Sequence, residues 1–197
     1  MIERLGVFGG TFDPIHLAHL VLAEQAREQL RLDRILFVPA STPPHKIGRT
    51  LSPPKVRLEM VELAVAGHPQ FAASDLEIRR SGPSYTVDTV RSVHEKHPSA
   101  EIFLLLGGDS LLDFPTWREP REILEMATLG VMMREGSPRP PMLEADLSSR
   151  LVFVDAPLLP ISGTDLRRRV SEHRSIRYLV PASVEAFINE EGLYRPA

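Results

Sequence analysis

The chain has 197 residues, of which 43% are hydrophobic and 25% are charged, and it contains no cysteine. These values are typical of a soluble globular protein and fit a single domain spanning residues 1–197, while the missing cysteines exclude disulfides and thiolate metal sites. The formal net charge of −3 without a long basic run argues against nucleic acid as a partner, and no apolar stretch reaches the roughly 18 residues that span a bilayer, so we expect a cytoplasmic protein without membrane contact.

Strands and helices are expected to alternate along the whole chain. Apolar runs predict strands at 5–8, 35–38, 71–78 (with a bend), 102–106, 129–133 and 151–154. Helical spacing predicts helices over 17–30, 55–66, 84–97, 164–172 and 181–190, a helix ending over 123–126, and a loop at 138–141. Ser84 is a candidate N-cap, and Pro181 suits a first helical turn. The pattern predicts an α/β fold, a Rossmann-like doubly wound parallel sheet with a small C-terminal helical part.

Two glycine pairs follow predicted strands, at Gly9–Gly10 and at Gly107–Gly108. In a doubly wound parallel sheet, ligands bind beyond the carboxyl ends of the strands, where the direction of winding changes. Both pairs fall at such ends. The proline-rich stretch 39–54 follows the second strand and is expected to cover part of this edge.

The segment from Gly9 to His19 has the chemistry of a phosphate site. Its glycines allow close backbone approach, Thr11 supplies a hydroxyl, and the following helix start supplies amides that attract anions. His16 and His19 are three positions apart, so both imidazoles share one helix face and can donate to one polyphosphate. Alternatively, the two histidines cap the helix or fill the core. A metal site is disfavoured because no third ligand lies nearby.

This segment resembles the phosphate-binding signature of the nucleotidylyltransferase superfamily, (T/S)-F-D-P-x-H-x-G-H, with Ala18 in place of the usual glycine. Ile161–Arg167 resembles the second signature, I-S-S-T-x-(I/L)-R, with Gly163 in place of the second serine. The resemblance implies that His16, His19 and Arg167 are catalytic. The alternative for the second segment is a capped helix with a solvated face of arginines. The residues expected to bind ATP are Gly9, Gly10, Thr11, Phe12, His16, His19, Gly107, Asp109, Ser162, Thr164 and Arg167.

Other segments resemble, in order, landmarks of the nicotinate-mononucleotide adenylyltransferase family. They are Pro43–Lys46, Gly82–Thr89, Gly107–Leu111, Pro115–Trp117, Tyr178–Pro181 and Gly192–Tyr194. The resemblance implies transfer of AMP from ATP to nicotinate mononucleotide, with Mg²⁺ on the substrate phosphates near Asp109 and no protein metal site. The residues expected to bind the acceptor are His45, Lys46, Tyr85, Thr86 and Trp117. The indole would stack on the pyridine ring, and amides around Tyr85 would receive the carboxylate.

We expect direct in-line attack by the acceptor phosphate, with His16, His19, Lys46 and Arg167 supplying positive charge. Each acceptor residue also has a purely structural explanation, such as a core tryptophan, an exposed loop or a helix start. Two other functions stay open: an adenylyltransferase for another acceptor (nicotinamide mononucleotide or phosphopantetheine), and a nucleotide-binding module without catalysis. The length and the missing Lys-rich signature argue against an aminoacyl-tRNA synthetase core. The sequence leaves a homo-oligomer open.

Overall fold

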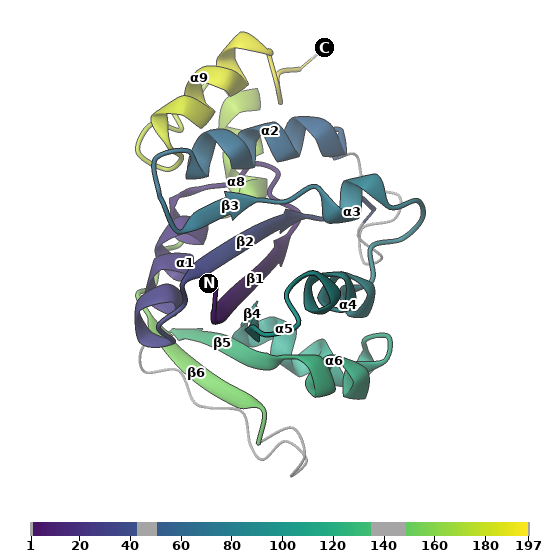
Figure 1. The fold of residues 1–197 in the computed structure, drawn as a ribbon. Helices are drawn as coiled ribbons and strands as arrows, with labels where there is room; N and C mark the ends of the chain where they lie inside the picture. The colour runs from purple at the N-terminus through teal and green to yellow at the C-terminus, as the bar shows by residue number, and fades with distance from the viewer. Residues whose placement is uncertain (1, 43–50, 135–148, 197) are drawn as a thin grey trace.

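The computed structural model describes residues 2–42, 51–134 and 149–196. Within them, parallel strands form one sheet in the order β3-β2-β1-β4-β5-β6 (Figure 1). The strands are β1 (Arg4–Gly10), β2 (Arg34–Pro39), β3 (Phe71–Ala73), β4 (Glu101–Gly107), β5 (Thr128–Arg134) and β6 (Leu151–Ala156). The helices are α1 (Leu17–Gln29), α2 (Pro54–Val65), α3 (Leu76–Arg79), α4 (Thr86–Lys96), α5 (Gly108–Asp113), the 3₁₀ helix η2 (Phe114–Thr116), α6 (Pro120–Met126), α8 (Gly163–Ser171) and α9 (Ala182–Glu190). The predicted fold class is confirmed.

Helices cover both faces of the sheet, so the central strands are buried and almost continuously apolar. On one face, α1, α2, α8 and α9 contribute apolar side chains to a core that includes Phe8 and Phe37. On the other, α4, α5 and α6 pack against Val7 and Leu104. Figure 1 shows α2, α8 and α9 together at one end of the molecule, and α4, α5 and α6 on the opposite side of the sheet. Side chains alternate between the two cores along each strand, as period-two geometry requires.

The winding direction changes between β1 and β4. β1 pairs with β2 on one side, with Gly10 opposite Pro39, and with β4 on the other, with Phe8 opposite Leu105. The carboxyl ends of β1 and β4 therefore open at the same edge of the sheet. This is the edge where ligands bind in doubly wound folds.

Most predicted elements are confirmed to within a few residues, and the exceptions have physical reasons. The strand predicted over 71–78 is wrong: β3 ends at Ala73, and α3 begins at Leu76. Ser84 does not cap α4, whose N-cap is Tyr85, because the Ser84 hydroxyl accepts from the amides of Ser41 and Thr42. Pro181 is the N-cap of α9, one position before its first turn. The loop predicted over 138–141 lies outside the described residues.

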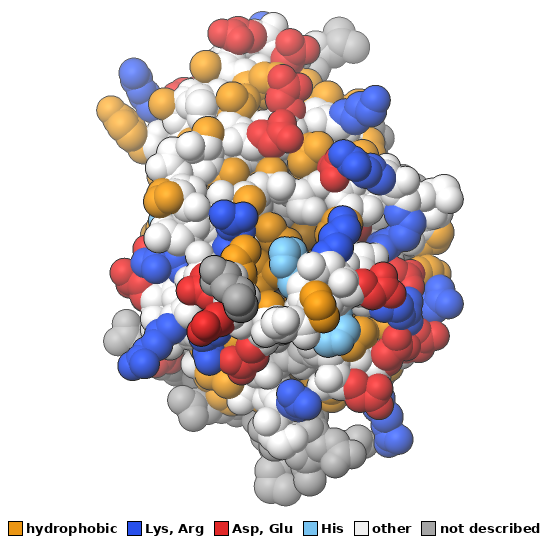
Figure 2. Space-filling model, in the orientation of Figure 1, with side chains coloured by type: hydrophobic (Ala, Val, Ile, Leu, Met, Phe, Trp, Pro, Cys, Tyr) orange, Lys and Arg blue, Asp and Glu red, His pale blue; other side chains and the backbone are white. Residues whose placement is uncertain are grey.

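Charge is mixed over the surface. Figure 2 shows basic and acidic side chains interspersed on the face in view, with acidic ones gathered over α2 and α9. An anionic ligand therefore has to be attracted by a local arrangement of donors. Along the described ranges, no helix combines the length and the apolar composition needed to cross a membrane.

Candidate active site

The two signature segments meet in one pocket beyond the carboxyl end of β1. The pocket has a volume of about 200 Å³. It is lined by Thr11, Phe12, Asp13, Pro14, His16, His19, Leu51, Ser162, Gly163, Thr164 and Arg167. Segments some 154 positions apart in the chain therefore face each other across it. Of the residues expected to bind ATP, those from both signatures lie together here, whereas Gly9, Gly10, Gly107 and Asp109 do not line the pocket.

His16 and His19 form a stacked pair at the start of α1. His16 is the N-cap and His19 the third helical residue. Their ring centroids are 3.7 Å apart with an interplanar angle of 19°. The backbone N–H of His16 donates to Nδ1 of His19 at 3.2 Å. Because that nitrogen accepts, the proton of a neutral His19 ring resides on Nε2. The predicted shared face is confirmed.

His16 is neutral in the free protein. Its side chain is only 6% exposed, and burial lowers its pKa from 6.5 to about 4. Among the described residues, its Nδ1 atom is buried without a hydrogen-bond partner. At neutral pH His16 therefore acts as a hydrogen-bonding imidazole, not as the cation expected from the sequence. A bound polyphosphate would raise this pKa, since a nearby anion favours the protonated form.

The buried His16 ring predicts a stability that depends on pH. In the unfolded chain the imidazole takes up a proton near pH 6.5, whereas the folded protein takes it up near 4. Between these values the unfolded state binds more protons, so the stabilisation present above the upper pKa is lost as pH falls. We expect this residue to account for a loss of about 2 kcal/mol between pH 7 and pH 5. Urea unfolding of wild type and His16→Asn at both pH values measures it. An equal pH dependence in the two proteins would contradict the assignment.

The second signature forms the opposite wall of the pocket. The Ser162 hydroxyl caps α8 by accepting from the amide of Asp165 at 3.1 Å. The Arg167 guanidinium donates to the Asp13 carbonyl at 2.6 Å and to the Thr164 hydroxyl at 3.3 Å. Arg167 thus contacts the first signature segment and is not a solvated surface charge.

The structure explains both departures from the signatures. A Cβ at Gly163 would lie 2.8 Å from the Asp13 carbonyl oxygen, so the glycine permits the two signature segments to approach closely. Ala18 is 6% exposed and does not line the pocket, so its methyl group packs inside the protein.

Asp13 connects four parts of the chain at the base of the pocket. Its buried carboxylate accepts from the Tyr194 hydroxyl at 2.6 Å and from the Ser52 amide at 3.2 Å, while its carbonyl receives Arg167. Burial, and then the negative charge of Asp13, raise the pKa of Tyr194, so the phenol keeps its proton and remains a donor. Tyr194 lies in one of the sequence landmarks, but this role was not predicted.

Arg57 is a second supporting residue that sequence reasoning missed. It is 1% exposed on α2, and its guanidinium donates to the carbonyls of Thr11, Ser41 and Ser52 at 2.7, 3.1 and 2.9 Å. Burial lowers its pKa from the usual value. It therefore ties the first signature segment to both described ends of the proline-rich stretch 39–54. Its spacing could have indicated that it is buried, because it shares a helix face with the buried Met60 and Val61.

Within the described ranges, the residues expected to bind the acceptor lie on the other side of the sheet. Tyr85 is the N-cap of α4, and Thr86 is the first residue of that helix. Trp117 is half-buried, with its ring 5.4 Å from that of Phe114. Arg118, which the sequence analysis did not single out, lies over the Tyr85 ring at 4.7 Å and joins the two segments. His45 and Lys46 lie outside the described residues.

The glycines and the aspartate at the strand ends have distinct environments. A side chain at Gly9 or Gly107 would meet no atom within 4 Å, so the space beyond both strands is open. Gly10 is required by packing, because a Cβ there would lie 2.8 Å from the Phe12 ring. Asp109 is exposed in the first turn of α5. In the described part of the chain, no three histidine, aspartate or glutamate side chains gather as a metal site.

Comparison with known proteins gives one family and closely similar relatives. The cytidylyltransferase-like family matches residues 7–169. A probable nicotinate-nucleotide adenylyltransferase of Thermomicrobium roseum is 48% identical, over 98% of this chain and 92% of the relative. A probable nicotinate-nucleotide adenylyltransferase of Thermus thermophilus is 49% identical, over 98% of this chain and 100% of the relative.

Solved structures support the fold. The chain is similar to Plasmodium falciparum nicotinic acid mononucleotide adenylyltransferase complexed with NaAD, with a TM-score of 0.79, 19% identity and coverage of 98% of this chain and 97% of the other. It is also similar to a putative nicotinate-nucleotide adenylyltransferase from Vibrio parahaemolyticus, with a TM-score of 0.72, 21% identity and coverage of 100% and 98%.

Proposed function

The chain belongs to the cytidylyltransferase-like family and, within it, to the nicotinate-nucleotide adenylyltransferases, and on this premise we propose that it transfers AMP from ATP to nicotinate mononucleotide. The products are nicotinate adenine dinucleotide (deamido-NAD) and pyrophosphate, a step of NAD biosynthesis. One observation supports this most strongly: the stacked His16–His19 pair and Arg167 line the same pocket. Two imidazole donors and one guanidinium, converging from two signature segments, suit a polyphosphate.

The proposed reaction is a direct in-line displacement. An oxygen of the acceptor's phosphate forms a bond to the α-phosphorus of ATP, and the bond from that phosphorus to the bridging oxygen breaks, releasing pyrophosphate. The attacking phosphate is already largely ionised near neutral pH, so no side chain has to remove a proton. Catalysis then rests on positioning and on stabilising developing charge. His16 and His19 would donate to the α-phosphoryl oxygens, and Arg167 with the α8 amides would bind the leaving phosphates.

Magnesium is proposed to bind with ATP. The donor set agrees with this: the Asp13 carboxylate is occupied by protein donors, and Asp109 is an exposed carboxylate at the carboxyl end of β4. The ion would be held mainly by substrate phosphates, with Asp109 ordering its hydration or binding ribose hydroxyls. When bound, it neutralises charge on the leaving pyrophosphate.

Acceptor selection is assigned to the start of α4 and to Trp117. The first amides of a helix have no partner within the helix, and they favour an anion such as the nicotinate carboxylate. The amide of nicotinamide mononucleotide would present its NH₂ group to these donors and leave them unpaired. Trp117 and Arg118 would then border the pyridine ring of the acceptor from the η2 side.

The test compares kcat/KM for nicotinate and nicotinamide mononucleotides with ATP, by pyrophosphate release. We expect a preference for the acid of at least about 100-fold, because unpaired buried donors impose a large penalty on the amide. A preference for nicotinamide mononucleotide, or for phosphopantetheine, would reassign the acceptor. ATP binding without pyrophosphate release on any of the three would instead indicate a module without catalysis.

A further inference from the structure

Glu77 is a buried carboxylate that the reaction does not use. It lies on α3 and is 7% exposed. Burial raises the pKa of its carboxyl, while the Thr89 and Ser84 hydroxyls and the charges of Arg80 and Arg57 act in the opposite direction. Burying a carboxylate is costly unless it is hydrogen-bonded, so the arrangement of its partners indicates what it stabilises.

The first partner is Ser84, whose oxygen accepts from the backbone amides of Ser41 and Thr42 at 3.0 and 3.3 Å. With both lone pairs occupied, its hydroxyl hydrogen remains available, and the Ser84 hydroxyl acts to lower the pKa of the Glu77 carboxyl. The Ser84 amide in turn donates to the Thr42 carbonyl at 3.1 Å. Glu77 thus fixes the residue that joins the start of α4 to the chain leaving β2.

The second partner is Thr89, one turn into α4. Its hydroxyl donates to Glu77 Oε1 at 2.7 Å and accepts from the Arg80 guanidinium at 3.1 Å. The same guanidinium reaches the Tyr85 carbonyl at 3.5 Å. Both hydroxyl relays from Glu77 therefore converge on the backbone around Tyr85, the N-cap of α4.

We propose that Glu77 is a positioning residue for the nicotinate mononucleotide half of the site, holding the Ser84–Tyr85 turn so that the first amides of α4 face the acceptor. The proposal rests on the proposed function and extends it to a residue that touches no substrate. The contacts run to the α4 start and to Ser41–Thr42, and none reaches the His16–His19 pair. Binding of the acceptor should therefore depend on Glu77, and binding of ATP should not.

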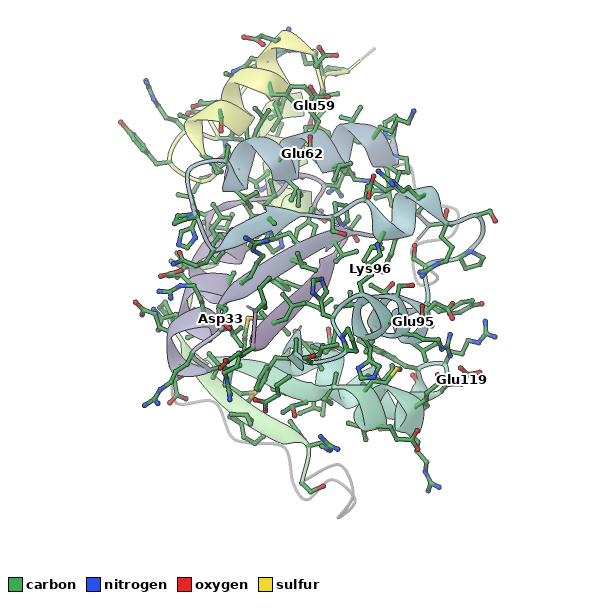
Figure 3. All side chains as sticks on the ribbon, viewed as in Figure 1. Asp33, Glu59, Glu62, Glu95, Lys96 and Glu119 are labelled. Carbon is green, nitrogen blue, oxygen red and sulfur yellow. The ribbon has the colours of Figure 1, made fainter. Side chains whose placement is uncertain are left out.

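Steady-state kinetics of Glu77→Gln, with each substrate varied in turn, tests this. The amide keeps the size of the side chain but offers one acceptor oxygen to two donating hydroxyls. We expect the KM for nicotinate mononucleotide to rise about tenfold, a change equivalent to ~1.4 kcal/mol, with the KM for ATP within about twofold of wild type. Glu62→Gln is the matched control. This exposed glutamate lies on α2, as Figure 3 shows, and its replacement should leave both constants unchanged.

Ser84→Ala tests the link between Glu77 and Ser84 by changing Ser84. It replaces Glu77→Gln in the test if that variant does not fold. Because both changes affect the link between Glu77 and Ser84, the acceptor KM of the double variant should rise by less than the product of the two single-variant increases. Equal changes in both KM values, or an unchanged acceptor KM in the folded variants, would overturn the positioning role alone. A wild-type enzyme that does not adenylylate nicotinate mononucleotide would overturn the proposed function and this inference with it.

Discussion

Replacing His19 with alanine should lower kcat by about 10²- to 10³-fold, the usual cost of removing one preorganised donor from a developing oxyanion. The structure specifies which atom matters. Nδ1 of His19 accepts from the His16 backbone, so Nε2 is the nitrogen that carries the proton toward a ligand. The His16 amide fixes this tautomer before substrate binds, and the edge contact of Phe12 at 5.0 Å restrains the ring.

Two isosteres separate the roles of the two nitrogens. In His19→Gln the side-chain NH₂ reaches the position of Nε2, whereas in His19→Asn the amide stays near that of Nδ1. We expect His19→Gln to retain clearly more activity than His19→Asn, with circular dichroism confirming that both variants fold. Near-normal kcat in His19→Ala, or equal kcat in the two isosteres, would mean that Nε2 is not the catalytic donor.

The alternation of strands and helices was predictable because it depends on local periodicity. Each strand buried on both faces reads as an apolar run, and the structure places β1, β2, β4, β5 and β6 at the predicted sites. The strand predicted over 71–78 was wrong because a short apolar pattern there does not distinguish a strand from a helix. Glu77 and Ile78 fit a bent strand in sequence, but only Phe71–Ala73 pairs with β2 before the chain turns into α3.

The pocket lined by the two signatures was predictable from them, but the residues that support it were not. Asp13 and Tyr194 are 181 positions apart, and no local pattern places a phenol on that carboxylate. Ser84 likewise had the spacing of an N-cap, and only the crossover from β2 brings the amides of Ser41 and Thr42 to it. Such contacts depend on how the crossovers return to the sheet. The side chains in a sequence can therefore indicate a site without identifying the distant residues that support its structure.

The supporting residues share a physical logic. Arg57 donates to three backbone carbonyls, and Arg167 donates to a fourth, so two guanidiniums hold loop backbone and not carboxylates. Arg57 is buried and does not line the pocket, so only Arg167 of the two faces a ligand there. An approaching polyphosphate would meet a guanidinium whose hydrogen bonds are already partly made, which reduces the ordering cost of binding.

Replacing Arg167 with lysine should lower kcat/KM for ATP by about one hundredfold, or ~2.7 kcal/mol, although the charge is kept. The guanidinium uses one N–H on the Asp13 carbonyl and one on the Thr164 hydroxyl, and its other donors remain for phosphate. A lysine ammonium is a single point that cannot hold the Asp13 carbonyl and also span two phosphate oxygens. The KM for nicotinate mononucleotide should change little, because Tyr85 and Trp117, which we propose bind the acceptor, lie on the other face of the sheet.

Arg168→Lys is the matched control for this substitution, because the exposed Arg168 pairs with Asp165 and Glu172 on the same helix and does not line the pocket. If Arg167→Lys and Arg168→Lys behave alike, Arg167 is an ordinary surface charge. Salt screens exposed charges but leaves a directed hydrogen bond largely intact. If only Arg167→Lys loses kcat/KM for ATP, and added salt does not cause the same loss in wild type, the defect lies in geometry and not in charge. The fork shape of the guanidinium, anchored on the first signature, is then what the second signature contributes to ATP binding.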